Sequence, residues 1–200
     1  MNQLIIIAHP RKESFNYTIL KSLSEAFEKM GDKVKIRDLY DMHFKPVLGF
    51  EELKYTREGK VCPDIAVEQN YIEWADQLTF IYPLWWNAFP AILKGYIDRV
   101  FTNGFAYAVT SEGPKGLLNN KKVHLITSAG MDEESLKQSN VFDSLKVTQD
   151  EGVFKFCGME VAGHHYITES TALSAEDKEK FLGKVINAVV KHSYGQPVNG

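Results

Sequence analysis

Short apolar runs that alternate with helical patterns constrain the fold of this chain more than any other sequence feature. The first run, from Leu4 to Ala8, contains three consecutive isoleucines and is typical of a strand buried on both faces of a parallel sheet. Similar runs predict further strands over 34–39, 78–82, 122–127 and 159–167. Strands that alternate with helices predict an α/β fold, with helices on both faces of a doubly wound parallel sheet and right-handed crossovers.

Apolar residues at helical spacing fill most of the segments between these strands. They predict helices over 16–30, 64–74, 90–103, 134–157 and 174–192. Residues 40–63 are expected to form a long irregular loop because they contain several prolines and glycines. We expect a single domain over residues 1–193, followed by a loose C-terminal tail over 194–200.

Composition excludes several classes of protein. Lys and Arg number 23 and Asp and Glu number 26, so the net charge of −3 argues against a nucleic-acid partner. The apolar run at the N-terminus is too short to span a bilayer and lacks the features of a signal peptide, so no integral membrane segment is expected. Cys62 and Cys157 form no disulfide framework, which predicts reduced thiols in a cytoplasmic protein.

Ligands of open parallel sheets bind beside the carboxyl ends of the strands, and three loops leave such ends here. They span 9–16, 83–87 and 127–130, and we expect them to converge. The first contains neither a dinucleotide-binding glycine motif nor a P-loop, but offers His9, Ser14 and Asn16 at the start of a helix, where phosphate binds well. Alternatively, Ser14 and Asn16 only cap the helix.

The second loop offers flat aromatic side chains, and the small residues of the third loop allow a ligand to approach the backbone closely. Trp85 and Trp86 cannot both face one core, so one ring lines a ligand, or the pair covers the sheet as an aromatic plug. The third loop is small and polar. Tyr107 stacks on a ligand or donates a hydrogen bond to it, or belongs to the core or a dimer contact. His164 and His165 are adjacent on a strand and point to opposite faces, which disfavours a metal pair.

Several blocks of residues resemble the NAD(P)H:quinone oxidoreductases of the DT-diaphorase type. The blocks are His9-Pro10, Ser14-Phe15-Asn16, Tyr82-Pro83-Leu84-Trp85-Trp86, Pro90-Ala91-Ile92-Leu93-Lys94-Gly95, Asp98-Arg99-Val100-Phe101 and Phe105-Ala106-Tyr107. The resemblance is clear over residues 3–130 and fainter as far as Gly158. It implies a flavodoxin-like fold with strand order 2-1-3-4-5, a tightly bound flavin and a homodimer. It also implies two-electron, ping-pong transfer from NAD(P)H to a quinone or to similar azo or nitro acceptors.

The resemblance also assigns roles to residues. His9, Ser14, Phe15 and Asn16 would hold the flavin phosphate and ribityl chain, and Tyr107 would reach the substrate pocket across the dimer interface. The residues that would line the ring or close over its polar edge are Pro83, Leu84, Trp85, Trp86, Asn87, Thr127, Ser128, Ala129 and Gly130. The intermediate length of the loop over 47–62 leaves FAD or FMN open, with a slight preference for FAD.

Two departures from the family pattern affect the expected chemistry. The third loop reads Thr127-Ser128-Ala129-Gly130 where the family has Thr-Thr-Gly-Gly, and residues 131–140 contain neither the Tyr nor the His of the charge relay described for animal members. No general acid is therefore assigned. A flavin-bearing regulatory subunit of a membrane transporter and a flavodoxin-type electron carrier remain as alternatives, since a fold does not fix a function.

Overall fold

A five-stranded parallel sheet forms the centre of the protein, as the sequence predicts. The computed structural model describes residues 1–194, so the predicted tail lies outside the described residues except for Tyr194, which ends a helix. The sheet has the order β2-β1-β3-β6-β7, which confirms the predicted order of strands. Its strands are β1 (Asn2–Ile7), β2 (Lys33–Asp38), β3 (Gln77–Pro83), β6 (Lys122–Ser128) and β7 (Glu160–Ile167). The domain boundary at residue 193 stays a prediction.

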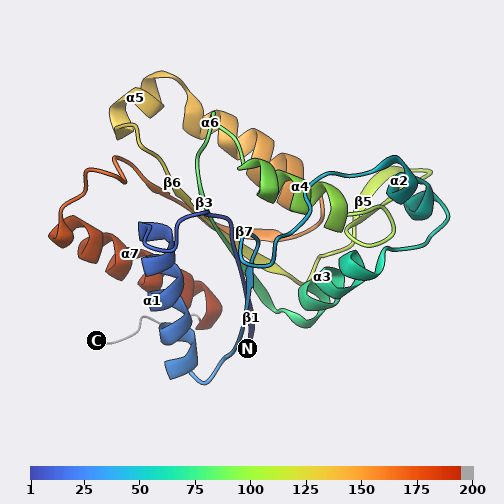
Figure 1. The fold of residues 1–200 in the computed structure, drawn as a ribbon, viewed down its shortest axis with the longest axis horizontal. Helices are drawn as coiled ribbons and strands as arrows, with labels where there is room; N and C mark the ends of the chain where they lie inside the picture. The colour runs from blue at the N-terminus through green and yellow to red at the C-terminus, as the bar shows by residue number, and fades with distance from the viewer. Residues whose placement is uncertain (195–200) are drawn as a thin grey trace.

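Helices cover both faces of the sheet, as Figure 1 shows. On one face lie α1 (Phe15–Lys29) and α7 (Ala175–Tyr194); on the other lie α3 (Pro63–Trp74), α4 (Ala91–Val100) and the π-helix η1 (Lys146–Lys155). Side chains alternate along a strand, so Leu4 and Ile6 enter the core beneath α3 and α4 while Ile5 and Ile7 pack under α1 and α7. Two short helices, α5 (Glu133–Gln138) and α6 (Val141–Leu145), precede η1.

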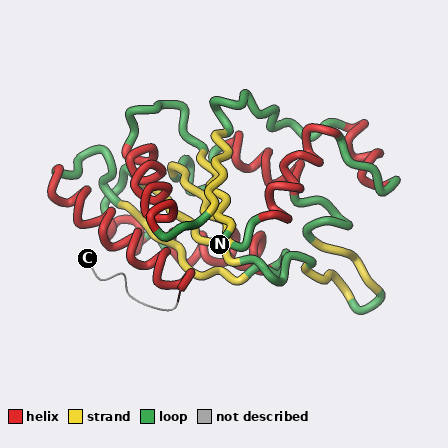
Figure 2. Tube along the Cα trace, turned by 90° about the horizontal axis from the view of Figure 1, so that it is seen from below, coloured by secondary structure: helices red, strands yellow, loops and turns green. Residues whose placement is uncertain are grey.

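Two elements depart from the sequence prediction. Helix α2 (Phe50–Arg57) lies inside the segment expected to be an irregular loop, so that expectation is wrong for these residues. A hairpin of β4 (Tyr107–Thr110) and β5 (Gly113–Gly116) was not predicted, and Figure 2 shows it as an arm projecting from the body. Helix α2 buries none of its own residues, so it lacks the buried apolar face by which the other helices were predicted.

A buried arginine of α4 holds α2 in place. The Arg99 guanidinium donates to both carboxylate oxygens of Glu52 on α2, at 2.9 and 3.1 Å, and to Asp64 on α3 at 2.9 Å. It also donates to the Lys45 carbonyl at 2.7 Å. A fork of N–H donors that serves three elements at once fixes their relative positions. The position of α2 is therefore decided by a contact with a distant part of the chain.

Replacing Arg99 with Met is expected to lower the free energy of unfolding by about 3 kcal/mol, because Glu52 would keep a largely buried charge without its partner. Urea denaturation followed by far-UV circular dichroism measures this. Arg57→Met, on the exposed side of α2, is the matched control. Equal stability of the two variants would show that the Arg99 contacts contribute nothing.

The two cysteines are free and differ in exposure. Cys157 is buried, and burial raises the pKa of its thiol to about 11. Cys62 is half-buried at the start of α3. We expect iodoacetamide at pH 8 to label Cys62 and spare Cys157 in the native protein, and to label both in denaturant, as mass spectrometry would show. Cys62→Ser should remain unlabelled until it unfolds; rapid native labelling of that variant would contradict the burial of Cys157.

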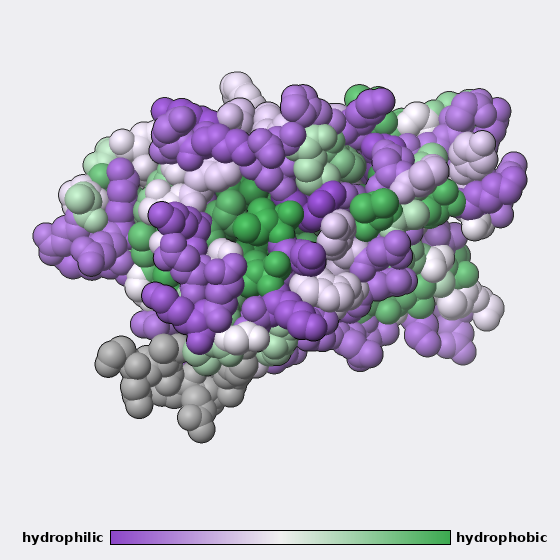
Figure 3. Space-filling view, turned by 60° about the horizontal axis from the view of Figure 1, so that its bottom comes forward, coloured by the Kyte–Doolittle hydropathy of each residue, from purple (hydrophilic) through white to green (hydrophobic). Residues whose placement is uncertain are grey.

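The outer surface combines hydrophilic and hydrophobic side chains. The face in Figure 3 is mostly hydrophilic, with hydrophobic patches between the polar side chains. No helix within residues 1–194 combines the length and apolar character needed to cross a membrane. The most exposed large apolar side chain of this part of the chain is Trp86, which is 99% exposed and lies in the second of the three candidate loops.

Candidate functional site

The three candidate loops meet at the carboxyl edge of the sheet, as expected from the parallel topology. The amide of Leu84 donates to the carbonyl of Ser128 at 2.7 Å, which joins the second loop to the third. The rings of His9 and Trp85 lie 6.3 Å apart between centroids, which joins the first loop to the second. Segments that are far apart in the sequence therefore form one continuous edge.

The first loop presents buried polar atoms whose hydrogen bonds are not made within the protein. Ser14 and Asn16 are 4% and 2% exposed, yet Ser14 Oγ and Asn16 Nδ2 have no hydrogen-bond partner among residues 1–194. Ser14 occupies the N-cap position of α1 without a side-chain capping bond, so capping alone does not account for these residues. Buried donors without partners are rare, and at a helix N-terminus they fit an anionic group such as a phosphate.

His9 begins the same loop. Its Nδ1 lies 3.0 Å from the backbone nitrogen of Arg11 and 3.2 Å from the Arg11 carbonyl oxygen, so the main chain of Arg11 holds this side of the ring. Burial, together with the charge of Arg11, lowers the pKa of His9 below its usual value. The uncharged form of the ring is therefore favoured.

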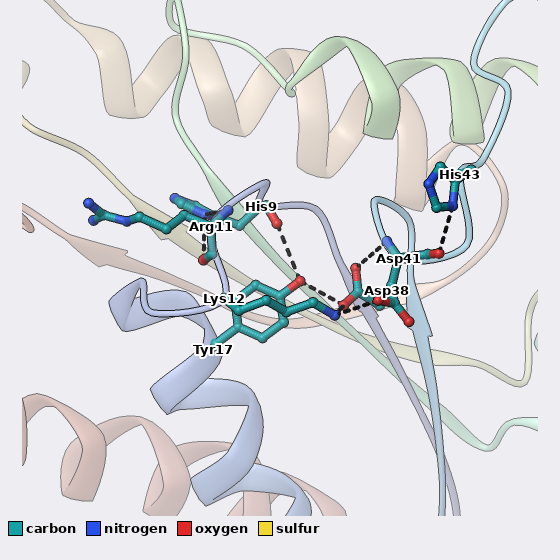
Figure 4. Close-up of polar contacts among 7 residues, drawn as sticks. All are labelled: His9, Arg11, Lys12, Tyr17, Asp38, Asp41 and His43. Carbon is teal, nitrogen blue, oxygen red and sulfur yellow. Dashed lines mark hydrogen bonds and ion pairs between the residues drawn. The ribbon is translucent and has the colours of Figure 1, made fainter.

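A cluster of charged residues fastens the first loop to the end of β2 (Figure 4). The Lys12 ammonium lies 2.9 Å from Asp38 and 2.8 Å from Asp41, and the Tyr17 hydroxyl donates to Asp38 at 2.6 Å. Burial alone would raise the pKa of Asp38, but the hydrogen bonds from Tyr17 and Lys12 lower it. Lys12 is thus occupied with carboxylates, while the Arg11 side chain extends away from the cluster.

The second loop holds its tryptophans in a strained turn. Trp86 and Asn87 both have a φ of 52°, and the Ala88 amide closes the turn on the Trp85 carbonyl at 3.1 Å. A bulky residue with positive φ costs roughly 1–2 kcal/mol, and such strain concentrates at functional sites. The Trp86 ring packs against nothing that would offset this cost, and Trp85 is itself 42% exposed. The alternative of an aromatic plug is therefore wrong for Trp86.

The remaining residues of the second and third loops form a floor beneath this edge. Pro83 ends β3 in a buried position, and Leu84 packs beside Ala129. Thr127 and Ser128 are buried, whereas Gly130 is exposed and has open space where a side chain would stand. A glycine with open space around it allows a ligand to approach the backbone closely.

Two predicted site residues do not face this edge. The Phe15 ring packs against Phe181 of α7, so only the backbone of Phe15 is available to a ligand. Tyr107 lies on the β4–β5 hairpin, where its ring contacts Phe156 at 5.2 Å between centroids. No hydrogen bond or ring contact joins Tyr107 to the three loops in the part of the chain that the structure describes.

Asp150, a polar partner beneath the third loop, was missed by sequence reasoning. His164 lies 2.9 Å from the Thr127 hydroxyl and 2.7 Å from Asp150, whereas His165 points to the other face and stacks on His124. The opposite orientation of the two histidines confirms the prediction from the strand pattern. Residues 1–194 hold no cluster of His, Cys, Asp and Glu suited to a metal ion. No sequence spacing connects position 150 with position 164.

A fourth loop also closes the edge. The segment after β7 pairs with the third loop, since the Ser170 amide donates to the Ala129 carbonyl and the Ala129 amide donates to the Ile167 carbonyl, at 2.9 and 2.7 Å. The Glu169 amide donates to the Met131 carbonyl at 2.9 Å, and Glu169 has a φ of 49°. No sequence motif marks this segment, because main-chain pairing requires no particular side chains.

Comparison with known proteins agrees with this architecture. The model of the family described as "Flavodoxin-like fold" matches residues 1–192. A Haemophilus influenzae protein named an uncharacterized NAD(P)H oxidoreductase is 42% identical over 161 residues, which cover 80% of each chain. NAD(P)H dehydrogenase [quinone] 1 of Cavia porcellus is 35% identical over 178 residues, and the match spans 79% of this chain but only 65% of that protein.

A solved structure extends the comparison over nearly the whole chain. The NAD(P)H:quinone oxidoreductase of Methanothermobacter marburgensis superposes with a TM-score of 0.85 at 27% identity, covering 97% of this chain and 98% of the other. The fold and the converging loops define an α/β protein with a candidate ligand site at the ends of its parallel strands. The chain belongs to the flavodoxin-like fold family, among the NAD(P)H:quinone oxidoreductases that its motifs resemble.

Proposed function

We propose that this protein is a flavin-dependent NAD(P)H:quinone oxidoreductase that transfers two electrons in a ping-pong cycle to quinones or to similar azo or nitro acceptors. The observation that carries the proposal is the pair of buried, unpartnered donors, Ser14 Oγ and Asn16 Nδ2, at the N-terminus of α1. These donors fit the phosphate of a flavin nucleotide. When bound, the flavin supplies the hydride chemistry, and the protein binds and orients the reactants.

Different residues at the carboxyl edge of the sheet would bind different parts of the flavin. The His9 ring would contact the phosphate and ribityl chain, and Ser14 Oγ and Asn16 Nδ2 would donate hydrogen bonds to them. Trp85 and Trp86 provide aromatic surface beside the ring, and Gly130 leaves room above its polar edge. Because Trp86 is fully exposed, its ring is also available to shield the bound substrates from water.

Three finer points belong to this proposal. FAD is slightly preferred over FMN because helix α2 and its surroundings lengthen the segment after β2. A homodimer would bring the projecting hairpin, and with it Tyr107, to the substrate pocket of the partner, since one chain does not place Tyr107 there. The cytoplasmic location expected from the two cysteines stays a prediction.

The visible absorption spectrum tests the proposed function. The purified protein is reconstituted with FAD or FMN, reduced with NADPH without oxygen, and then mixed with a benzoquinone. We expect the flavin absorbance to bleach and then to recover with one quinone per NADPH. A bound flavin that NADPH does not bleach would favour the electron carrier or the regulatory subunit, and a protein that binds neither flavin would overturn the proposal.

A further inference from the structure

A closed set of buried polar side chains lies directly under the second and third loops. Asp150 Oδ1 is 2.7 Å from His164 Nδ1, and His164 Nε2 is 2.9 Å from Thr127 Oγ1. On the next strand, the Tyr82 hydroxyl donates to Gln149 Oε1 at 2.5 Å. Tyr82 and Thr127 are register partners on β3 and β6. The side chains therefore form a path that starts at Asp150 on η1 and passes through His164 of β7, Thr127 of β6 and Tyr82 of β3. It ends at Gln149, the neighbour of Asp150 on η1.

The π-helix and the stacking of rings keep these groups in place. Gln149 and Asp150 are 2% and 8% exposed, so both side chains turn inward from η1. π-helical turns are rare and frequently mark functional sites. The His164 ring stacks on Tyr166 with centroids 4.1 Å apart, and its side chain is only 5% exposed. Such a well-packed ring has little freedom to change its hydrogen-bond partners.

The chemistry of the three groups fixes the direction of their protons. A carboxylate accepts hydrogen bonds only, so His164 Nδ1–H donates to Asp150. In the neutral ring, His164 Nε2 carries the lone pair and the Thr127 hydroxyl donates to it. With its single proton directed at His164, the Thr127 oxygen can act toward its other neighbours only as an acceptor.

We propose that Asp150 and His164 are positioning residues that fix the proton of the Thr127 hydroxyl and so hold the first residue of the third loop in place at the flavin site. This inference rests on the proposed function for its effect on flavin, but the hydrogen-bond direction is a property of the protein alone. Thr127 is fully buried and opens the third loop, so its rotamer and the following backbone depend on this bond. Asp150 and His164 thus hold the third loop through hydrogen bonds, although neither residue belongs to that loop.

The direction of the protons is measured first, on the flavin-free protein. ¹⁵N NMR distinguishes protonated from unprotonated imidazole nitrogens, and His164→Gln identifies the signals of this ring among the six histidines. We expect one proton, on Nδ1. A proton on Nε2, or on both nitrogens, would overturn the proposal, because the ring would then donate to Thr127.

Asp150→Asn provides the perturbation. An asparagine in the place of a carboxylate keeps its shape but reverses the tautomer of the imidazole that it holds. We expect the NMR signals to report an Nε2 proton in this variant and the flavin dissociation constant to rise about tenfold, the cost of one misdirected hydrogen bond. The matched control is Glu151→Gln, which neutralises the next carboxylate on the exposed side of η1 and should change neither.

A double-mutant cycle separates this role from a merely structural one. Thr127→Val removes the hydroxyl and keeps the side-chain shape, so Asp150→Asn should change the flavin dissociation constant by less than about twofold in that background. An equal, additive loss in both backgrounds would show that Asp150 acts through general stability and would overturn the proposal. If the wild-type protein bound no flavin, the proposed function would fail, while the NMR result would still decide the proton direction.

Discussion

Asn16→Asp is expected to weaken flavin binding about a hundredfold. The Asn16 side chain is 2% exposed and its Nδ2 donor has no partner among residues 1–194, so the substitution replaces an available donor with a buried negative charge. Two like charges about 5 Å apart at the effective dielectric of a protein repel by about 3 kcal/mol, which is about two factors of ten in affinity. Fluorescence titration of the flavin-free protein with FAD and with FMN measures the effect.

Asn187→Asp is the matched control for this prediction. It adds the same charge on the exposed side of α7, away from the three loops. We expect flavin affinity within about twofold of the wild type, because exposed charges are screened beyond roughly 8–10 Å. Unchanged affinity in Asn16→Asp would remove the first loop from the flavin site.

Replacing Trp86 should separate turnover from stability. The Trp86 ring is 99% exposed and its φ is 52°, so Trp86→Gly relieves backbone strain and is expected to raise the free energy of unfolding by about 0.5–1 kcal/mol. Trp86→Ala removes the ring without relieving the strain and should leave stability within about 0.5 kcal/mol. Both variants should lower quinone reductase turnover about tenfold or more, because the ring contributes to the reactant site rather than to the core.

The control for Trp86 is Met30→Ala, which removes another exposed apolar side chain at the end of α1. The end of α1 lies on the opposite edge of the sheet from the three loops, where the strands begin. Steady-state turnover with NADPH and a benzoquinone, together with urea denaturation, gives both quantities for each variant. Full activity in Trp86→Ala would exclude the ring from the reactant site.

The regular part of the fold was predictable because each strand and helix buries a face that its own sequence encodes. The run from Leu4 to Ala8 is typical of a strand with both faces covered, and the structure divides its side chains between two cores. Helix α2 could not be found in this way, since it buries no residue of its own and depends on Arg99, which lies 47 residues after its partner Glu52 in the sequence. Similarly, Glu169 and Ser170 join the edge through main-chain atoms alone.

The candidate site was predictable to a lesser extent. The positions of the three loops followed from the rule that parallel strands end at one edge, and His9, Ser14 and Asn16 followed from their place before a helix. The sequence could not separate capping from ligand binding at Ser14, because both uses require the same hydroxyl. Only the structure shows that the hydroxyl is buried and that the capping bond is not made.

The sequence by itself determined the α/β class and the edge at which a ligand is expected, because these depend on local hydrophobic patterns and on the handedness of the chain, whereas the order of the strands was implied by the resemblance of its motifs to a known family. The tertiary structure alone decided which polar groups are buried without partners and which are paired across strands. Asp150, His164 and Thr127 come from three separate elements, and their distances of 2.7 and 2.9 Å exist only once the sheet has formed. Hydrogen bonding acts through space at short range, so separation along the sequence carries no information about it.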